Sequence, residues 1–105
     1  MNIDTQFELS SERYCETKYL KKEDRLIEIC KSNSATTYIN PIGGEELYRK
    51  SFFNKHNVKL FFIKTNQTPY KQFNHDFTAG LSILDVLMFN SIEEVNRMLN
   101  NYELL

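Results

Sequence analysis

The sequence contains only two cysteines, Cys15 and Cys30, and their spacing matches no zinc-binding or redox motif. We expect two reduced thiols rather than a disulfide, as is usual in a cytoplasmic protein. Cys30 falls on the apolar face of a predicted helix and is therefore expected to be buried.

Strong charge of either sign and long hydrophobic runs are also missing. Thirteen basic and fourteen acidic side chains give a net charge of -1, and no basic tract exceeds Lys21-Lys22. This balance argues against a nucleic-acid partner. The longest strongly apolar run, Leu81 to Phe89, is too short to cross a bilayer. The first ten residues do not resemble a signal peptide, so we expect a cytoplasmic protein without membrane insertion.

Metal-ligating and catalytic groupings are absent as well. The only histidines, His56 and His75, are expected at the surface, and neither has a convincing second metal ligand at suitable spacing. No Ser-His-Asp or Cys-His grouping and no nucleophile elbow can be identified. Neither GxGxxG nor GxxxxGK[ST] occurs, which weakens a phosphate-binding interpretation. We predict no metal and no cofactor.

What the sequence does contain is enough apolar material for a small core. Of the 105 residues, 41% are hydrophobic and 13% are aromatic, although the mean hydropathy of -0.51 is rather polar. This length is sufficient for one domain, which we expect to span residues 1–105 with residues 1–19 poorly defined.

The most informative stretch is TTYINPIGGEELY, which covers residues 36–48. It predicts a strand, Thr36 to Ile39, a tight turn at Asn40, and a helix from Glu45 to Lys50. Gly43 and Gly44 would allow a positive φ or a close backbone approach. A turn of this kind at the carboxyl end of a strand is where open α/β folds bind ligands. A turn that simply needs flexible residues explains the same pattern about equally well.

Hydrophobic periodicity predicts the other elements. The expected elements are strands at Gln6–Leu9 and Val58–Lys64, a helix at Glu23–Asn33, and two closing helices that begin at Ser82 and Ser91. The near-continuous apolar run of Val58–Lys64 is typical of a strand covered on both faces. The last helix would carry one apolar stripe, made of Ile92, Val95, Leu99 and Tyr102. The alternation predicts an α/β fold: a small, mainly parallel three-stranded sheet with flanking helices, part of a larger domain.

A long aromatic-rich loop, Asn66 to Gly80, contains Tyr70 and Gln72, which are candidates to line a pocket. Asp85 lies between apolar neighbours in the following helix. It is expected either to cap that helix together with Ser82 or to act as a partly buried catalytic carboxylate.

Several blocks of this chain resemble the WbqC-like family. They are YINPIGG-x-x-LY at residue 38, YKQF at residue 70 and LSI-x-DVLMFN at residue 81, in that order and at the expected distances. The resemblance runs from about residue 20 to residue 105. The His-Gln-Pro-x-Tyr-Leu-Pro type motif that family members carry near their start has no counterpart before Glu23. The chain therefore resembles the carboxyl-terminal part of the family, as a fragment or a shortened gene product.

The resemblance implies a role in bacterial surface polysaccharide (O-antigen) biosynthesis. We expect the chain to bind a sugar-linked or nucleotide-linked small molecule at the glycine turn. The candidate substrate-binding residues are Asn40, Gly43, Gly44, Tyr48 and Gln72, and Asp85 is the candidate catalytic residue. For Tyr48, packing alone is the favoured role. The alternative function is a non-catalytic remnant or interaction module that completes a partner chain. Because a small domain would leave apolar sheet and helix surface uncovered, we also expect a homodimer or a partner chain.

Overall fold

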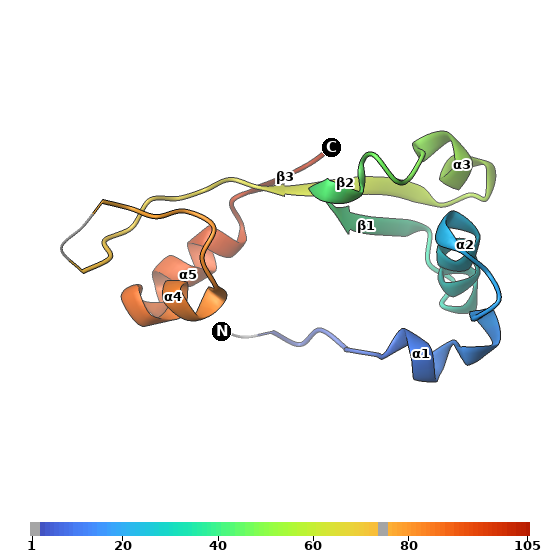
Figure 1. Cartoon of the computed structure of the whole chain (residues 1–105), viewed down its shortest axis with the longest axis horizontal. Helices are drawn as coiled ribbons and strands as arrows, with labels where there is room; N and C mark the ends of the chain where they lie inside the picture. Colours follow the sequence, from blue (N-terminus) through green and yellow to red (C-terminus); the bar gives the residue numbers. More distant parts are fainter. Residues whose placement is uncertain (1–2, 74–75) are drawn as a thin grey trace. The chain divides into compact units, whose positions relative to one another are not determined.

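A computed structural model describes residues 3–73 and 76–105 of the chain. These residues form two compact units (Figure 1), each described separately below. The sheet unit is Asp4–Lys64 with Leu104–Leu105, and the helical unit is Thr65–Glu103 with Ile3. The expectation of a single domain over residues 1–105 stays a prediction.

Ten elements follow one another in the described chain. They are α1 (Ser10–Arg13), the 3₁₀ turn η1 (Cys15–Thr17), α2 (Lys22–Ser32), β1 (Thr37–Pro41), the 3₁₀ turn η2 (Ile42–Gly44), α3 (Lys50–Lys55), β2 (Lys59–Thr65), α4 (Ile83–Phe89), α5 (Ile92–Leu99) and β3 (Tyr102–Leu104). This content confirms an α/β fold. Among the described residues, no helix is both long and apolar enough to span a membrane.

The three strands form one sheet in the order β1-β2-β3. β1 and β2 run parallel, with Tyr38 beside Leu60 and Asn40 beside Phe62. On the other side of β2, Phe62 and Leu105 exchange both backbone hydrogen bonds, at 3.0 and 2.9 Å. Such a reciprocal pair is antiparallel, so the sheet is mixed and not mainly parallel as predicted.

The third strand comes from an unexpected part of the chain. Gln6–Leu9 was predicted to be a strand from its alternation, but it forms none, and Phe7 is 83% exposed. The strand is instead β3, which includes Tyr102, a residue assigned to the stripe of the last helix. The helix ends at Leu99 because Asn100 leaves the helical conformation, and its backbone N–H bonds to the Arg97 carbonyl.

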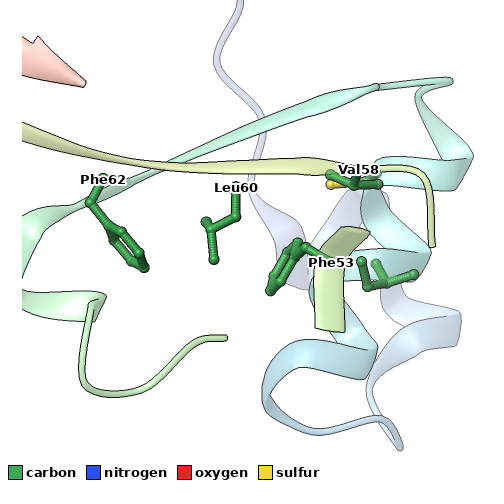
Figure 2. Packing of buried hydrophobic residues seen from close by; sticks show 6 residues of the cluster. Phe53, Val58, Leu60 and Phe62 are labelled. Atoms are coloured by element: carbon green, nitrogen blue, oxygen red, sulfur yellow. The ribbon is translucent and has the colours of Figure 1, made fainter. Parts of the chain in front are cut away.

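The core of the sheet unit lies on one face of β2. Phe53 of α3, Val58, and Leu60 and Phe62 of β2 gather there with Ile27 and Cys30 of α2 (Figure 2). Phe53 is completely buried, and its ring stacks on Tyr38 with the ring centroids 5.7 Å apart. The opposite face, which carries Phe61 and Ile63, is only half-buried. The prediction of a strand covered on both faces is therefore correct for one face only.

The glycine turn is followed by a different structure from the one predicted. The predicted helix Glu45–Lys50 does not form. Ile42–Gly44 is a single 3₁₀ turn, and α3 begins only at Lys50. Arg49 has an extended backbone at this start, and its N–H donates to Glu23 Oε1 of α2 at 2.7 Å. The Arg49 side chain pairs with the other oxygen of the same carboxylate at 3.1 Å. Because Glu23 of α2 fixes where α3 begins, the residues around the glycine turn could not predict that position.

The helical unit consists of a long loop and two capped helices, α4 and α5 (Figure 1). The Ser82 side chain accepts a hydrogen bond from the Leu84 N–H and so begins α4. Ser91 and Glu94 form a complete capping box at the start of α5. Both predicted helix starts are confirmed.

Candidate functional site

The loop before α4 is joined to that helix by a polar network centred on Asp85. The Tyr70 hydroxyl donates to Asp85 Oδ2 at 2.6 Å, and Gln72 Nε2 donates to the same oxygen at 2.8 Å. The predicted cap by Asp85 is therefore wrong: Ser82 caps α4, and the Asp85 carboxylate accepts hydrogen bonds from the loop. Asp85 is partly buried, as the alternative interpretation of a partly buried carboxylate expected.

Gln72 is the buried member of this network, with only 2% of its surface exposed. Its Nε2 also donates to the Thr78 carbonyl at 3.1 Å, and its Oε1 accepts from the Thr78 N–H at 2.7 Å. The amide thus makes three hydrogen bonds and joins Thr78, near the end of the loop, to Asp85 of α4. A buried polar side chain is stable in this position because its polar atoms are paired.

Tyr70 faces two pockets of the helical unit. The hydrogen bond to Asp85 raises the pKa of the Tyr70 phenol, because an ionised phenol has no hydrogen to donate to the carboxylate. The ring is also held by an edge contact with Phe77, at 5.0 Å between centroids. Tyr70 is therefore a neutral phenol in a fixed position, whose oxygen can still accept a hydrogen bond.

The first pocket, here called the polar pocket, has a volume of about 340 Å³. It is lined by Thr68, Pro69, Tyr70, Lys71, Phe89, Asn90, Glu94, Arg97 and Met98. Lys71 and Arg97 bring two positive charges to it, and Glu94 brings one negative charge. Donors of this kind suit an anionic or heavily hydroxylated ligand.

The second pocket, the apolar pocket, has a volume of about 160 Å³. It is lined by Thr65, Asn66, Gln67, Thr68, Tyr70, Ile83, Val86, Val95, Met98 and Leu99. Thr68, Tyr70 and Met98 line both pockets, so the two adjoin. Together they form a mostly apolar concavity with a few polar groups at one end, as is typical of small-molecule sites.

The predicted residues of the glycine turn lie in the sheet unit and pack on one another. Tyr38 donates to Asn40 Oδ1 at 3.0 Å, and Asn40 Nδ2 donates to the Pro41 carbonyl at 3.0 Å. The Asn40 amide covers Gly44 so closely that a methyl group there would overlap it, and Tyr48 lies 3.2 Å from the same point. Gly44 is therefore required for close approach, as predicted, and not for a positive φ.

Gly43 behaves differently, since a Cβ at that position would meet no atom within 4 Å. The structure thus brings Asn40, Gly44 and Tyr48 together in one unit and Gln72 and Asp85 together in the other. The binding roles of all five, and of Gly43, stay predictions.

Sequence reasoning missed Lys71, Arg97, Thr68 and Asn90 as pocket residues. Lys71 stands inside the YKQF block, between the two loop residues that were chosen, so its position was a usable signal. No signal in the sequence pointed to Arg97, because it lies 27 positions away from Tyr70 and its pattern is that of an exposed charge on α5.

Candidate metal ligands do not gather in the part of the chain that the structure describes, where no three His, Cys, Asp or Glu side chains form a group. His56 is exposed, as predicted, and its ring lies 4.9 Å from that of Phe52. His75 lies outside the described residues. Cys15 is exposed and Cys30 is buried, both as free thiols, and burial raises the pKa of the Cys30 thiol.

Comparison with known proteins gave one finding. Neither the curated proteins nor the solved structures contain a match to this chain. A family comparison matches residues 1–97 to the WbqC-like protein family. That match confirms the resemblance drawn from the YINPIGG, YKQF and LSI-x-DVLMFN blocks and extends it to the start of the chain. By its sequence, the chain belongs to the WbqC-like protein family.

Proposed function

We propose that this chain acts in bacterial surface polysaccharide biosynthesis, in the cytoplasm, by binding a sugar-linked or nucleotide-linked small molecule. The association with polysaccharides is what the family resemblance implies. The observation that carries the ligand proposal is the fixed Tyr70 phenol, which borders two adjoining pockets beside Lys71 and Arg97. Sugar and nucleotide derivatives carry hydroxyl and phosphate groups that such donors recognise.

Each residue of the network has a distinct part in this proposal. Tyr70 contacts the ligand. Asp85, which the sequence predicted to be catalytic, has the part of a positioning residue in this proposal, since it holds the Tyr70 hydroxyl in place. Gln72 fixes the loop that carries Tyr70. Asn40 and Gly44 shape the turn after β1, where the hydrogen bonds of Asn40 to Tyr38 and Pro41 support a structural contribution.

A thermal-shift screen of the full chain against nucleotide sugars and sugar phosphates tests the proposal. A ligand at 100 times its dissociation constant stabilises the fold by about 2.7 kcal/mol, which is a measurable shift. Asp85→Ala should abolish the shift, whereas Glu93→Ala, an exposed carboxylate at the start of α5, should leave it unchanged. If no compound in the screen shifts the unfolding temperature, the ligand proposal fails.

A second candidate function, a module that completes a homodimer or a partner chain, is favoured by exposed apolar side chains. Met88 and Leu84 of α4 are 81% and 68% exposed, and Ile39 on the open face of β1 is 47% exposed. Apolar surface of this kind often marks an interface. Light scattering at micromolar concentration should give a mass above that of the monomer. A monomer mass across a tenfold dilution series would rule out the homodimer.

A further inference from the structure

The polar pocket carries an excess of positive charge. The Arg97 side chain is 78% exposed, with its Nη2 4.0 Å from Glu94 Oε1 in a long surface ion pair, and Lys71 is exposed on the loop. Glu94 is the single carboxylate among the lining residues: its Oε1 pairs with Arg97, and its Oε2 accepts from the Ser91 N–H at 3.1 Å and from the Ser91 hydroxyl at 3.2 Å. Two cations against one carboxylate give the lining a net charge of +1, and an exposed pair as long as that of Arg97 and Glu94 is weak, so Arg97 can exchange Glu94 for an anionic ligand. The planar guanidinium of arginine matches the geometry of a phosphate group.

The apolar pocket has the size and surface of a ring site. An apolar cavity of about 150 Å³ holds a benzene molecule, and this pocket has about 160 Å³. One wall is aliphatic, with Ile83, Val86 and Leu99 from α4 and α5. The segment after β2 contributes two residues with amide side chains to the lining, Asn66 and Gln67. Aliphatic groups suit the faces of a planar heterocycle, and amides suit its polar edge.

The two pockets adjoin at Thr68, Tyr70 and Met98, so one ligand can occupy both. We propose that the ligand is a nucleoside diphosphate derivative, with its base in the apolar pocket and its phosphates against Lys71 and Arg97. This inference rests on the proposed ligand-binding function and narrows it from sugar-linked or nucleotide-linked compounds to nucleotide-linked ones. A simple sugar phosphate would leave the apolar pocket empty.

Calorimetric titration of the full chain tests the assignment with defined probes. These are the diphosphates of uridine, adenosine, guanosine, cytidine and thymidine, together with inorganic pyrophosphate and glucose 1-phosphate. At least one nucleoside diphosphate should bind tenfold or more tightly than pyrophosphate. Lys71→Ala and Arg97→Ala should each weaken that binding by about tenfold, the usual effect of losing a charge-assisted hydrogen bond. Lys55→Ala, an exposed cation at the end of α3, is the matched control and should have no effect.

Filling the apolar pocket separates recognition of the base from recognition of the phosphates. Leu99→Trp should weaken nucleoside diphosphate binding tenfold or more and leave pyrophosphate binding unchanged. If circular dichroism shows that this variant is unfolded, Ile83→Trp makes the same test, since Ile83 is 48% exposed. Glucose 1-phosphate binding as tightly as every nucleoside diphosphate would overturn the inference and leave the proposed function standing. Absence of binding by all probes, with no thermal shift from any nucleotide sugar or sugar phosphate, would overturn both.

Discussion

Each of the two units of this protein is stabilised internally by a different kind of contact. The sheet unit buries six neighbouring apolar side chains under β2, including the fully enclosed Phe53. Among the described residues of the helical unit, only Val95 and Gln72 are buried, and Gln72 is an amide held by hydrogen bonds. The first unit therefore depends on apolar burial, whereas the second depends on a polar network. A region organised by a few directed polar contacts is sensitive to the loss of a single contact.

Truncation of Phe53 should have the largest effect on stability. Phe53→Ala removes a buried ring and is expected to destabilise the sheet unit by about 3–5 kcal/mol. Urea unfolding followed by circular dichroism measures this loss. Phe7→Ala is the matched control, since Phe7 is 83% exposed and its loss should change stability by no more than about 0.5 kcal/mol. Equal losses of unfolding free energy for both substitutions would show that the sheet unit does not depend on burial of Phe53.

Loss of the Gln72 amide should have the next largest effect, confined to the helical unit. Gln72→Ala removes one hydrogen-bond donor to Asp85 and both hydrogen bonds between the Gln72 amide and the backbone of Thr78. We expect a cost of about 1–3 kcal/mol and faster hydrogen exchange in the loop before α4. Gln67→Ala, an exposed amide in the same loop, should leave exchange unchanged. Faster exchange across β1 and β2 instead would contradict the division between the two units.

The two neighbouring glycines of η2 offer a direct comparison within one turn. Gly44→Ala should destabilise the protein by about 1–3 kcal/mol, because the added methyl group overlaps the Asn40 side chain. Gly43→Ala should be neutral, or stabilising by up to about 1 kcal/mol, because the site is open and the unfolded chain loses freedom. Chemical denaturation gives both values. In the Asn40→Ala background the cost of Gly44→Ala should fall, and a cost that persists there would exclude the overlap as its cause.

The smallest expected effect concerns pH and the start of α3. The hydrogen bond from the Arg49 side chain lowers the pKa of Glu23, so its contribution is present above the unfolded-state pKa of the carboxyl. It should be lost as the pH falls through the lower, folded-state pKa. Glu23→Gln should therefore reduce stability at pH 7 and cease to matter in acid, as measured by urea unfolding between pH 2 and pH 7. Glu28→Gln, which breaks only the surface pair with Lys31, should show little pH dependence. A constant difference between wild type and Glu23→Gln would contradict the assignment.

The elements that sequence predicted well are those determined by neighbouring residues. α2 has acidic residues in its first turn and Lys31 in its last, and Ser91 with Glu94 begins α5, so local signals were sufficient. β3 could not be predicted in this way. Tyr102 continues the alternating three- and four-residue spacing of the α5 stripe, and its strand forms only because this segment pairs with β2.

The candidate site shows the same limit. Gln72 and Asp85 were chosen separately, one as a polar loop residue and the other as a carboxylate in an apolar helix. Their contact across 13 positions depends on how the loop folds back on α4, which no local pattern contains. The helix predicted after Gly44 failed for a related reason. The helix start is set by the carboxylate of Glu23, which lies 26 positions before Arg49.

The order of the strands along the chain has a consequence for how the protein folds. β2 and β3 are neighbours in the sheet, but residues 66–101, which include α4 and α5, lie between them in the chain. Asn66 and Asn101, which meet through a backbone hydrogen bond of 3.0 Å, are 35 positions apart. Closing a flexible loop of that length costs about 3 kcal/mol in chain entropy. If the inserted helices fold first, they hold the two ends together and much of this cost is removed before β3 pairs. A contact that stabilises the inserted helices would then also favour the pairing of β3 with β2.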